Sequence, residues 1–131
     1  MGKISTKATL VPLSETDIEI ADPAEDIRGY TVVDQAEEEI GKVDDLLIDT
    51  EEKKIRFMQV SSGGFLGLGT TRLYIPLDAI TDIEDETVHI NQTKEHVKNA
   101  PHYDPKLSNE RYLDGIYRYY GYPPFWGVGI K

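Results

Sequence analysis

The chain has 131 residues, 39% of them hydrophobic and 29% charged, so it is long enough for one hydrophobic core and too hydrophobic to stay disordered. Its net charge of -10, with 14 basic residues scattered among 24 acidic ones, argues against a surface that binds nucleic acid or anionic lipid. The absence of cysteine excludes disulfides, thiolate metal sites and thiol nucleophiles.

Residues 1–25 are expected to form a lead-in segment. A short apolar patch at residues 10–13 precedes an acidic stretch, and Pro12 and Pro23 interrupt any regular pattern. We expect this segment to pack one short piece against the domain that follows. No stretch of the chain has an apolar run of signal-peptide or membrane-spanning length, so we expect a cytoplasmic protein without membrane insertion.

The next part of the chain has the pattern of an antiparallel all-β domain. Short apolar runs rich in β-branched residues alternate with turns of charged residues or glycine. Gly29 interrupts the first run, at a position where a strand can bend, and Pro76 ends the fourth. The predicted strands cover residues 27–33, 41–48, 55–60 and 71–75, a short strand ending near residue 83, and residues 87–90.

Residues 92–131 predict helices and an aromatic tail. Thr93 can cap a short helix that ends before Pro101. A second helix, capped by Asp104, is expected to run to about residue 120, because helical spacing then gives it one apolar face. That face consists of Leu113, Ile116, Tyr117 and Tyr120.

Four segments in this order resemble the PRC-barrel family: residues 26–30, 40–49, 55–60 and 74–80. The resemblance implies a mainly β fold, a small antiparallel barrel over residues 26–91 with one or two short C-terminal helices. Members of the family include reaction-centre H subunits, ribosome-maturation factors that dock a ribosomal protein, and stand-alone bacterial and archaeal proteins. Because neither a membrane helix nor an RNA-associated domain precedes the barrel here, the chain is more similar to the stand-alone type, and a photosynthetic role is not expected. The resemblance implies an architecture rather than a task.

The loop at residues 61–70 combines four glycines with three apolar side chains. Its glycines do not predict a phosphate site, because no lysine follows them and the next element is a strand rather than a helix. The apolar side chains are Phe65, Leu66 and Leu68. Either the C-terminal tail covers them within the chain, or they form the centre of a contact with a partner.

The C-terminal stretch is rich in aromatic side chains, which are favoured at protein interfaces. Its candidate partner-binding residues are Tyr119, Tyr120, Tyr122, Phe125 and Trp126. Two interpretations are open: the stretch packs back on the barrel as a strap, or it forms a contact with a second copy of the chain.

Acidic and histidine residues do not predict a metal centre or a catalytic site. The carboxylates around the second turn lack the loop spacing of a known calcium motif, and the three histidines are widely spaced, as surface histidines are. No serine lies in the context of an activated nucleophile. The carboxylates are Asp44, Asp45, Asp49, Glu51 and Glu52.

The sequence therefore predicts a non-catalytic protein-interaction or scaffolding module that needs no cofactor. We expect it to bind an unidentified protein, or a second copy of itself, through the apolar loop and the C-terminal aromatic stretch. The alternative is a domain that senses a small ligand or a divalent cation with the acidic hairpin.

Overall fold

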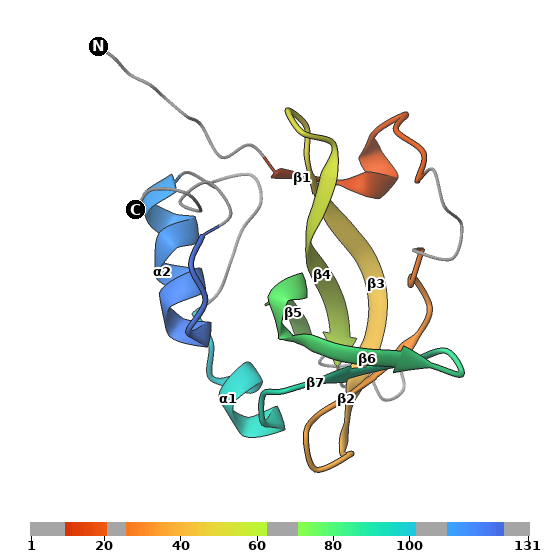
Figure 1. The fold of residues 1–131 in the computed structure, drawn as a ribbon, viewed down its shortest axis with the longest axis vertical. Coiled ribbons are helices and arrows are strands. Elements are labelled where there is room, and N and C mark those ends of the chain that lie inside the picture. The colour runs from red at the N-terminus through yellow and green to blue at the C-terminus, as the bar shows by residue number, and fades with distance from the viewer. Residues whose placement is uncertain (1–9, 21–25, 63–70, 102–109, 125–131) are drawn as a thin grey trace.

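A computed structural model provides the structure, and it describes residues 10–20, 26–62, 71–101 and 110–124. These residues form one strongly curved sheet with two α-helices at one side (Figure 1). The strands are β1 (Leu10–Pro12), β2 (Thr31–Val33), β3 (Glu39–Asp49), β4 (Lys54–Ser62), β5 (Thr71–Pro76), β6 (Ile80–Glu84) and β7 (Thr87–Ile90). The helices are η1 (Leu13–Glu15), η4 (Leu77–Ala79), α1 (Lys94–Lys98) and α2 (Glu110–Tyr120).

The strands follow the order β5-β4-β3-β2-β7-β6, and β1 pairs with β3 off this path. A mainly β fold is thereby confirmed. The structure differs from a purely antiparallel barrel in one pairing, because β2 and β7 run parallel. A parallel pair needs a long crossover, and here that crossover is the whole segment from β3 to β6. Within the described residues, the terminal strands β5 and β6 do not pair with each other, so the sheet stays open there.

The sheet is buried on both faces at its centre. Phe57, Met58, Gln59 and Val60 follow one another along β4, and all four are buried. Since side chains alternate across a strand, consecutive buried residues require cover on both sides. Met58 and Val60 face one side of the sheet, whereas Phe57 faces the other, where its ring lies 5.1 Å from that of Tyr117 in α2. Helix α2 therefore extends the core on the face of β4 to which Phe57 points.

The first predicted strand, residues 27–33, is wrong in its first half. Only Thr31–Val33 are a strand, and the preceding residues form a turn in which the Tyr30 N–H donates to the Ile27 carbonyl oxygen over 3.0 Å. The cause is Gly29, whose φ of 92° lies in the left-handed region, and whose N–H donates to the Val43 carbonyl oxygen over 2.8 Å. The bend predicted at Gly29 is confirmed, and it is sharp enough to end the strand.

Local signals correctly place α1 and the C-terminal end of α2, whereas the short helices η1 and η4 were not predicted. The Thr93 side chain accepts a hydrogen bond from the His96 N–H over 3.1 Å, which confirms Thr93 as the cap of α1. Helix α2 ends near residue 120, as predicted. Its predicted start at Asp104 lies outside the described residues.

The turn between β6 and β7 offers a test of local strain. Glu84 pairs with Thr87, and the two residues between them, Asp85 and Glu86, have φ values of 52° and 59°. Such a two-residue turn favours glycine at its second position, because a side chain there is strained. We expect Glu86→Gly to raise the free energy of unfolding by about 0.5–1 kcal/mol in urea titrations.

A matched control removes the same side chain from a regular strand position. Glu84→Gly, two residues earlier and in β6, should lower the free energy of unfolding, because glycine weakens a strand. If both variants shift stability in the same direction, the effect comes from the lost negative charge and not from the backbone.

Candidate functional site

The structure describes three of the eight predicted partner-binding residues. Phe65, Leu66, Leu68, Phe125 and Trp126 lie outside the described residues. Tyr119, Tyr120 and Tyr122 lie at the C-terminal end of α2, so the site is built from there.

Helix α2 is amphipathic, as the spacing of its apolar residues predicts. A tyrosine on the apolar face is therefore buried, whereas one beside it stays partly exposed. Leu113, Ile116, Tyr117 and Tyr120 are all buried on the face that meets the sheet. Tyr120 is only 5% exposed, and burial raises the pKa of its hydroxyl above the usual value, with Tyr119 and Tyr122 adding to the shift. Tyr120 is thus a core residue, and the half-exposed tyrosines are Tyr119 and Tyr122.

Tyr119 stacks on His96 of α1 and is hydrogen-bonded to it. The two rings are stacked, with centroids 4.2 Å apart and an angle of 8° between their planes. The Tyr119 hydroxyl donates to the His96 carbonyl oxygen over 2.7 Å, and His96 Nε2 lies 3.2 Å from the Tyr119 carbonyl oxygen. These contacts join two residues that are 23 positions apart, and they hold the Tyr119 ring in one orientation.

Tyr122 is held by the segment that leads into α1. Its hydroxyl donates to Asn91 Oδ1 over 2.6 Å and accepts from Gln92 Nε2 over 2.9 Å. The chain reaches this position because Gly121, with a φ of 89°, ends α2 in a tight turn. In that turn the Tyr122 N–H donates to the Tyr117 carbonyl oxygen over 3.0 Å.

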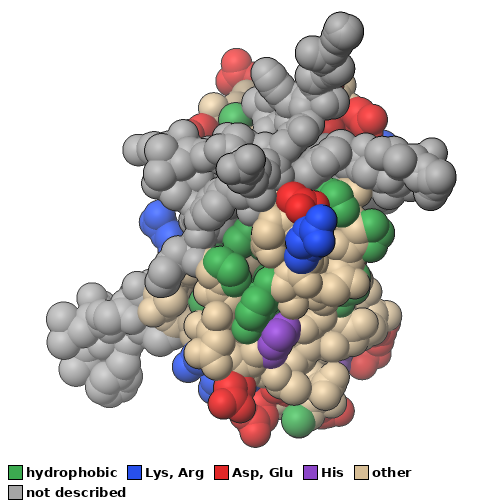
Figure 2. Space-filling view, turned by 90° about the vertical axis from the view of Figure 1, so that its left-hand side faces the viewer, with side chains coloured by type: hydrophobic (Ala, Val, Ile, Leu, Met, Phe, Trp, Pro, Cys, Tyr) green, Lys and Arg blue, Asp and Glu red, His purple; other side chains and the backbone are tan. Residues whose placement is uncertain are grey.

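Together Tyr119, Tyr122 and His96 form a surface that we call the aromatic face. Figure 2 shows this side of the molecule, where a histidine side chain lies among hydrophobic ones, with a basic and an acidic side chain in contact above them. On α2 the Arg118 guanidinium bonds to Asp114 over 2.6 Å, so these charges neutralise each other. The histidine's part in this site was missed by the sequence interpretation, which treated the histidines as surface residues, because its partner is distant in the chain.

The acidic hairpin does not assemble a cation site. Asp44 accepts from Gln59 Nε2 over 2.9 Å, and Asp45 accepts from the N–H and the hydroxyl of Ser14 over 3.2 and 2.5 Å. Glu52 pairs with Arg56 over 2.7 Å. In the part of the chain that the structure describes, no three acidic or histidine side chains converge as metal ligands do. The cation-sensing alternative therefore finds no support in this geometry.

Across the described helices, none combines the length and hydrophobicity needed to cross a bilayer.

Comparison with known proteins agrees with the fold. A search of the curated proteins found no match. The family model for the PRC-barrel domain matches residues 19–97, which is more than half of the chain and includes β2 to β7. The chain therefore belongs to the PRC-barrel family.

Proposed function

We propose that this PRC-barrel protein is a non-catalytic module that binds another protein through its aromatic face. The observation that carries the proposal is the pair Tyr119 and Tyr122, half-exposed and each held by hydrogen bonds to the segment before and within α1. Tyrosines are enriched among the residues that dominate binding energy. Rings that are already fixed lose little conformational entropy when a partner binds, which favours affinity.

The aromatic face needs a larger contact around it. Burying one aromatic side chain contributes about 1.5–3 kcal/mol, whereas association costs about 4–15 kcal/mol, so two tyrosines alone cannot hold a tight partner. We propose that the remaining area comes from the apolar loop and the aromatic tail. These are Phe65, Leu66, Leu68, Phe125 and Trp126.

A binding role fits the polar residues better than a catalytic one. Three buried polar side chains of the described region are used inside the fold: Asp34 and Asp45 accept backbone N–H groups, and Gln59 bridges Asp44 and Tyr74. A catalytic site instead needs a nucleophile or a base that is accessible to substrate. Binding is thus the function that the architecture and these contacts favour.

The test is capture and measurement of the partner. The native chain, crosslinked in lysate of its source cells, should retain a protein that the double variant Tyr119→Ala/Tyr122→Ala loses, with at least a tenfold rise in the dissociation constant once the pair is purified. The control is Ile83→Ala, which removes a hydrophobic side chain that is 42% exposed. It lies on β6, a strand whose arrow points away from α2 in Figure 1. Equal binding by the native chain and the double variant would contradict the proposal.

The same variants decide whether the partner is a second copy of the chain. If the aromatic face joins two copies, light scattering should give a dimer mass for the native chain and for Ile83→Ala, and a monomer mass for the double variant. A chain truncated before Pro105, which lacks α2, should also be monomeric. A native chain that stays monomeric at high concentration would exclude the second copy.

A further inference from the structure

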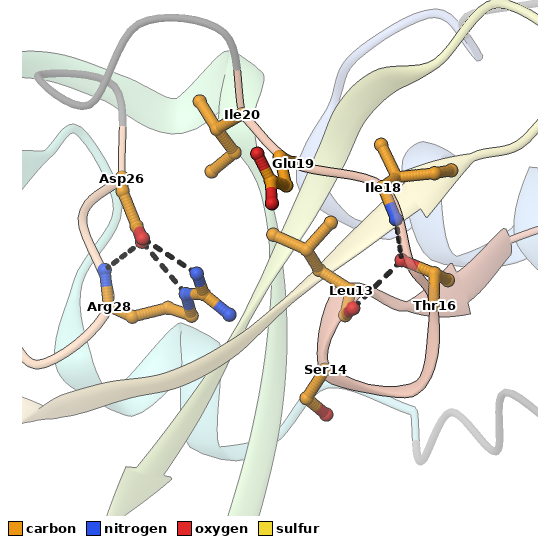
Figure 3. Close-up of a pocket in the computed structure, with 8 residues that line it drawn as sticks. All are labelled: Leu13, Ser14, Thr16, Ile18, Glu19, Ile20, Asp26 and Arg28. Atoms are coloured by element: carbon orange, nitrogen blue, oxygen red, sulfur yellow. Dashed lines mark hydrogen bonds and ion pairs between the residues drawn. The ribbon is translucent and has the colours of Figure 1, made fainter.

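A second surface lies around η1, well separated from α2 in Figure 1. There the N-terminal segment and the turn before β2 enclose a pocket of about 430 Å³ (Figure 3). This volume falls within the range of about 300–1,000 Å³ that is typical of ligand-binding pockets. Its lining combines apolar and charged side chains: Leu13, Ser14, Thr16, Ile18, Glu19, Ile20, Asp26 and Arg28.

One wall of the pocket is the segment of residues 18–20, which pairs with no strand among the described residues. Residues 18–20 alternate as a strand does, with Ile18 and Ile20 half-buried and Glu19 exposed between them. The Ile18 N–H donates to the Thr16 hydroxyl over 3.1 Å, but the segment makes no backbone hydrogen bond to any other described residue. Unpaired backbone groups on an extended segment can accept an additional strand from another chain.

The charges in the pocket favour a basic occupant. Arg28 is bound to Asp26, with Nε 2.8 Å from Oδ1 and Nη2 2.6 Å from Oδ2, so its charge is already neutralised. The hydrogen bond from the Arg28 side chain lowers the pKa of Asp26, which therefore stays ionised at neutral pH. Glu19 points into the pocket in Figure 3 and has no ion-pair partner among the described residues. Counting only described residues, one negative charge is left uncompensated, beside apolar walls made by Leu13, Ile18 and Ile20.

We propose that this pocket binds an extended, lysine-bearing segment of a partner protein, which adds as a strand beside residues 18–20. The lysine places its ammonium group against Glu19, and the apolar residues that flank it in the added strand lie on the face of Ile18 and Ile20, because side chains alternate along both strands. An acidic segment is disfavoured, because Glu19 would repel it. This site is independent of the aromatic face, so either one can fail without the other.

The probe is a fluorescein-labelled peptide of sequence Lys-Ile-Lys-Ile-Lys, compared with Glu-Ile-Glu-Ile-Glu, in fluorescence anisotropy titrations against the full chain. The native chain should bind the basic peptide at least tenfold more tightly than the acidic one. Glu19→Lys should abolish this preference, and Glu51→Lys, which changes the net charge equally on the exposed β3–β4 turn, should preserve it. If both variants lose the preference for the basic peptide equally, binding follows total charge and the proposal is overturned. A native chain that shows no preference between the two peptides would also overturn it.

Two methylated probes test the added strand. An extended peptide offers its N–H groups alternately to its two edges, so methylating the isoleucine amides or the lysine amides removes the donors from one edge only. Pairing with residues 18–20 predicts that one methylated peptide loses at least tenfold in affinity while the other binds like the parent. Equal affinity of all three peptides would overturn strand addition. Tighter binding of a peptide with the sequence of residues 2–9, which carries Lys3 and Lys7, would replace the partner protein by the chain itself as the occupant and so also overturn the proposal.

Discussion

Gly41→Ala is expected to lower the free energy of unfolding by about 3 kcal/mol, at the upper end of the usual cost of overpacking. Gly41 lies in β3, and a Cβ atom added there would lie 2.2 Å from the Ser61 carbonyl oxygen and 2.9 Å from the Ser61 carbonyl carbon. Both are backbone atoms, so no side-chain rotation relieves the clash. β3 and β4 would have to separate at the centre of the sheet. Urea unfolding followed by circular dichroism measures the loss.

The control for this variant is the same substitution at an open position. Gly115 lies in α2, exposed, and a Cβ atom added there meets nothing within 4 Å. Gly115→Ala should therefore raise the free energy of unfolding by about 0.5–1 kcal/mol, because alanine favours a helix more than glycine does. A loss of less than about 1 kcal/mol in Gly41→Ala would mean that the two strands tolerate a wider spacing than their geometry indicates.

Asp34→Asn is expected to cost about 2–4 kcal/mol, since each hydrogen bond to a charged group contributes about 1.5–3 kcal/mol. Asp34 is 4% exposed, and its carboxylate accepts the N–H groups of Ala36, Glu38 and Lys94 over 2.8, 2.8 and 2.9 Å. It thus ties the β2–β3 turn to the start of α1, which supports the aromatic face. The asparagine amide keeps the shape but turns one acceptor into a donor that faces another N–H. Asp82→Asn, exposed on β6, is the control that removes an equal charge.

The cost of Asp34→Asn should depend on pH. Burial raises the pKa of Asp34, but the backbone donors Glu38, Lys94 and Ala36 together bring it below its ordinary value. A carboxyl group with a lowered pKa stabilises the fold above its unfolded pKa of about 4 and loses this contribution as the pH falls through the folded pKa. The difference in stability between the native chain and Asp34→Asn should be full at pH 6 and shrink below about pH 4. A difference that stays constant over this range would show that the charge of Asp34 does not matter.

Elements with strong local signals could be predicted from the sequence. The apolar run predicted at residues 55–60 lies within β4, and residues 87–90 are β7, because β-branched residues between turn-forming residues favour strands wherever they pack. The cap at Thr93 also depends only on its own neighbours. The strand predicted at residues 27–33 failed because Gly29 hydrogen-bonds to β3, a strand whose position the local pattern does not contain.

The candidate site could be predicted less well than the fold. The many aromatic residues at the end of α2 indicated a candidate binding site there, and helical spacing placed Tyr117 and Tyr120 on the apolar face of the helix. It could not show that Tyr119 stacks on His96, because the two are 23 residues apart. The pocket at η1 likewise depends on two segments that are brought together by the pairing of β1 and β2 with β3.

The sequence by itself determined the mainly β class, the places of most strands and the cap of α1, because periodicity and turn chemistry act over a few residues. Only the tertiary structure decided that β2 and β7 pair in parallel and that Tyr120 is buried while Tyr119 and Tyr122 stay half-exposed. It also decided that residues 18–20 pair with no strand in the part of the chain that the structure describes. These features are set by contacts such as that from Asp34 to Lys94, which spans 60 residues. The packing of distant segments chooses among the arrangements that local preferences leave open.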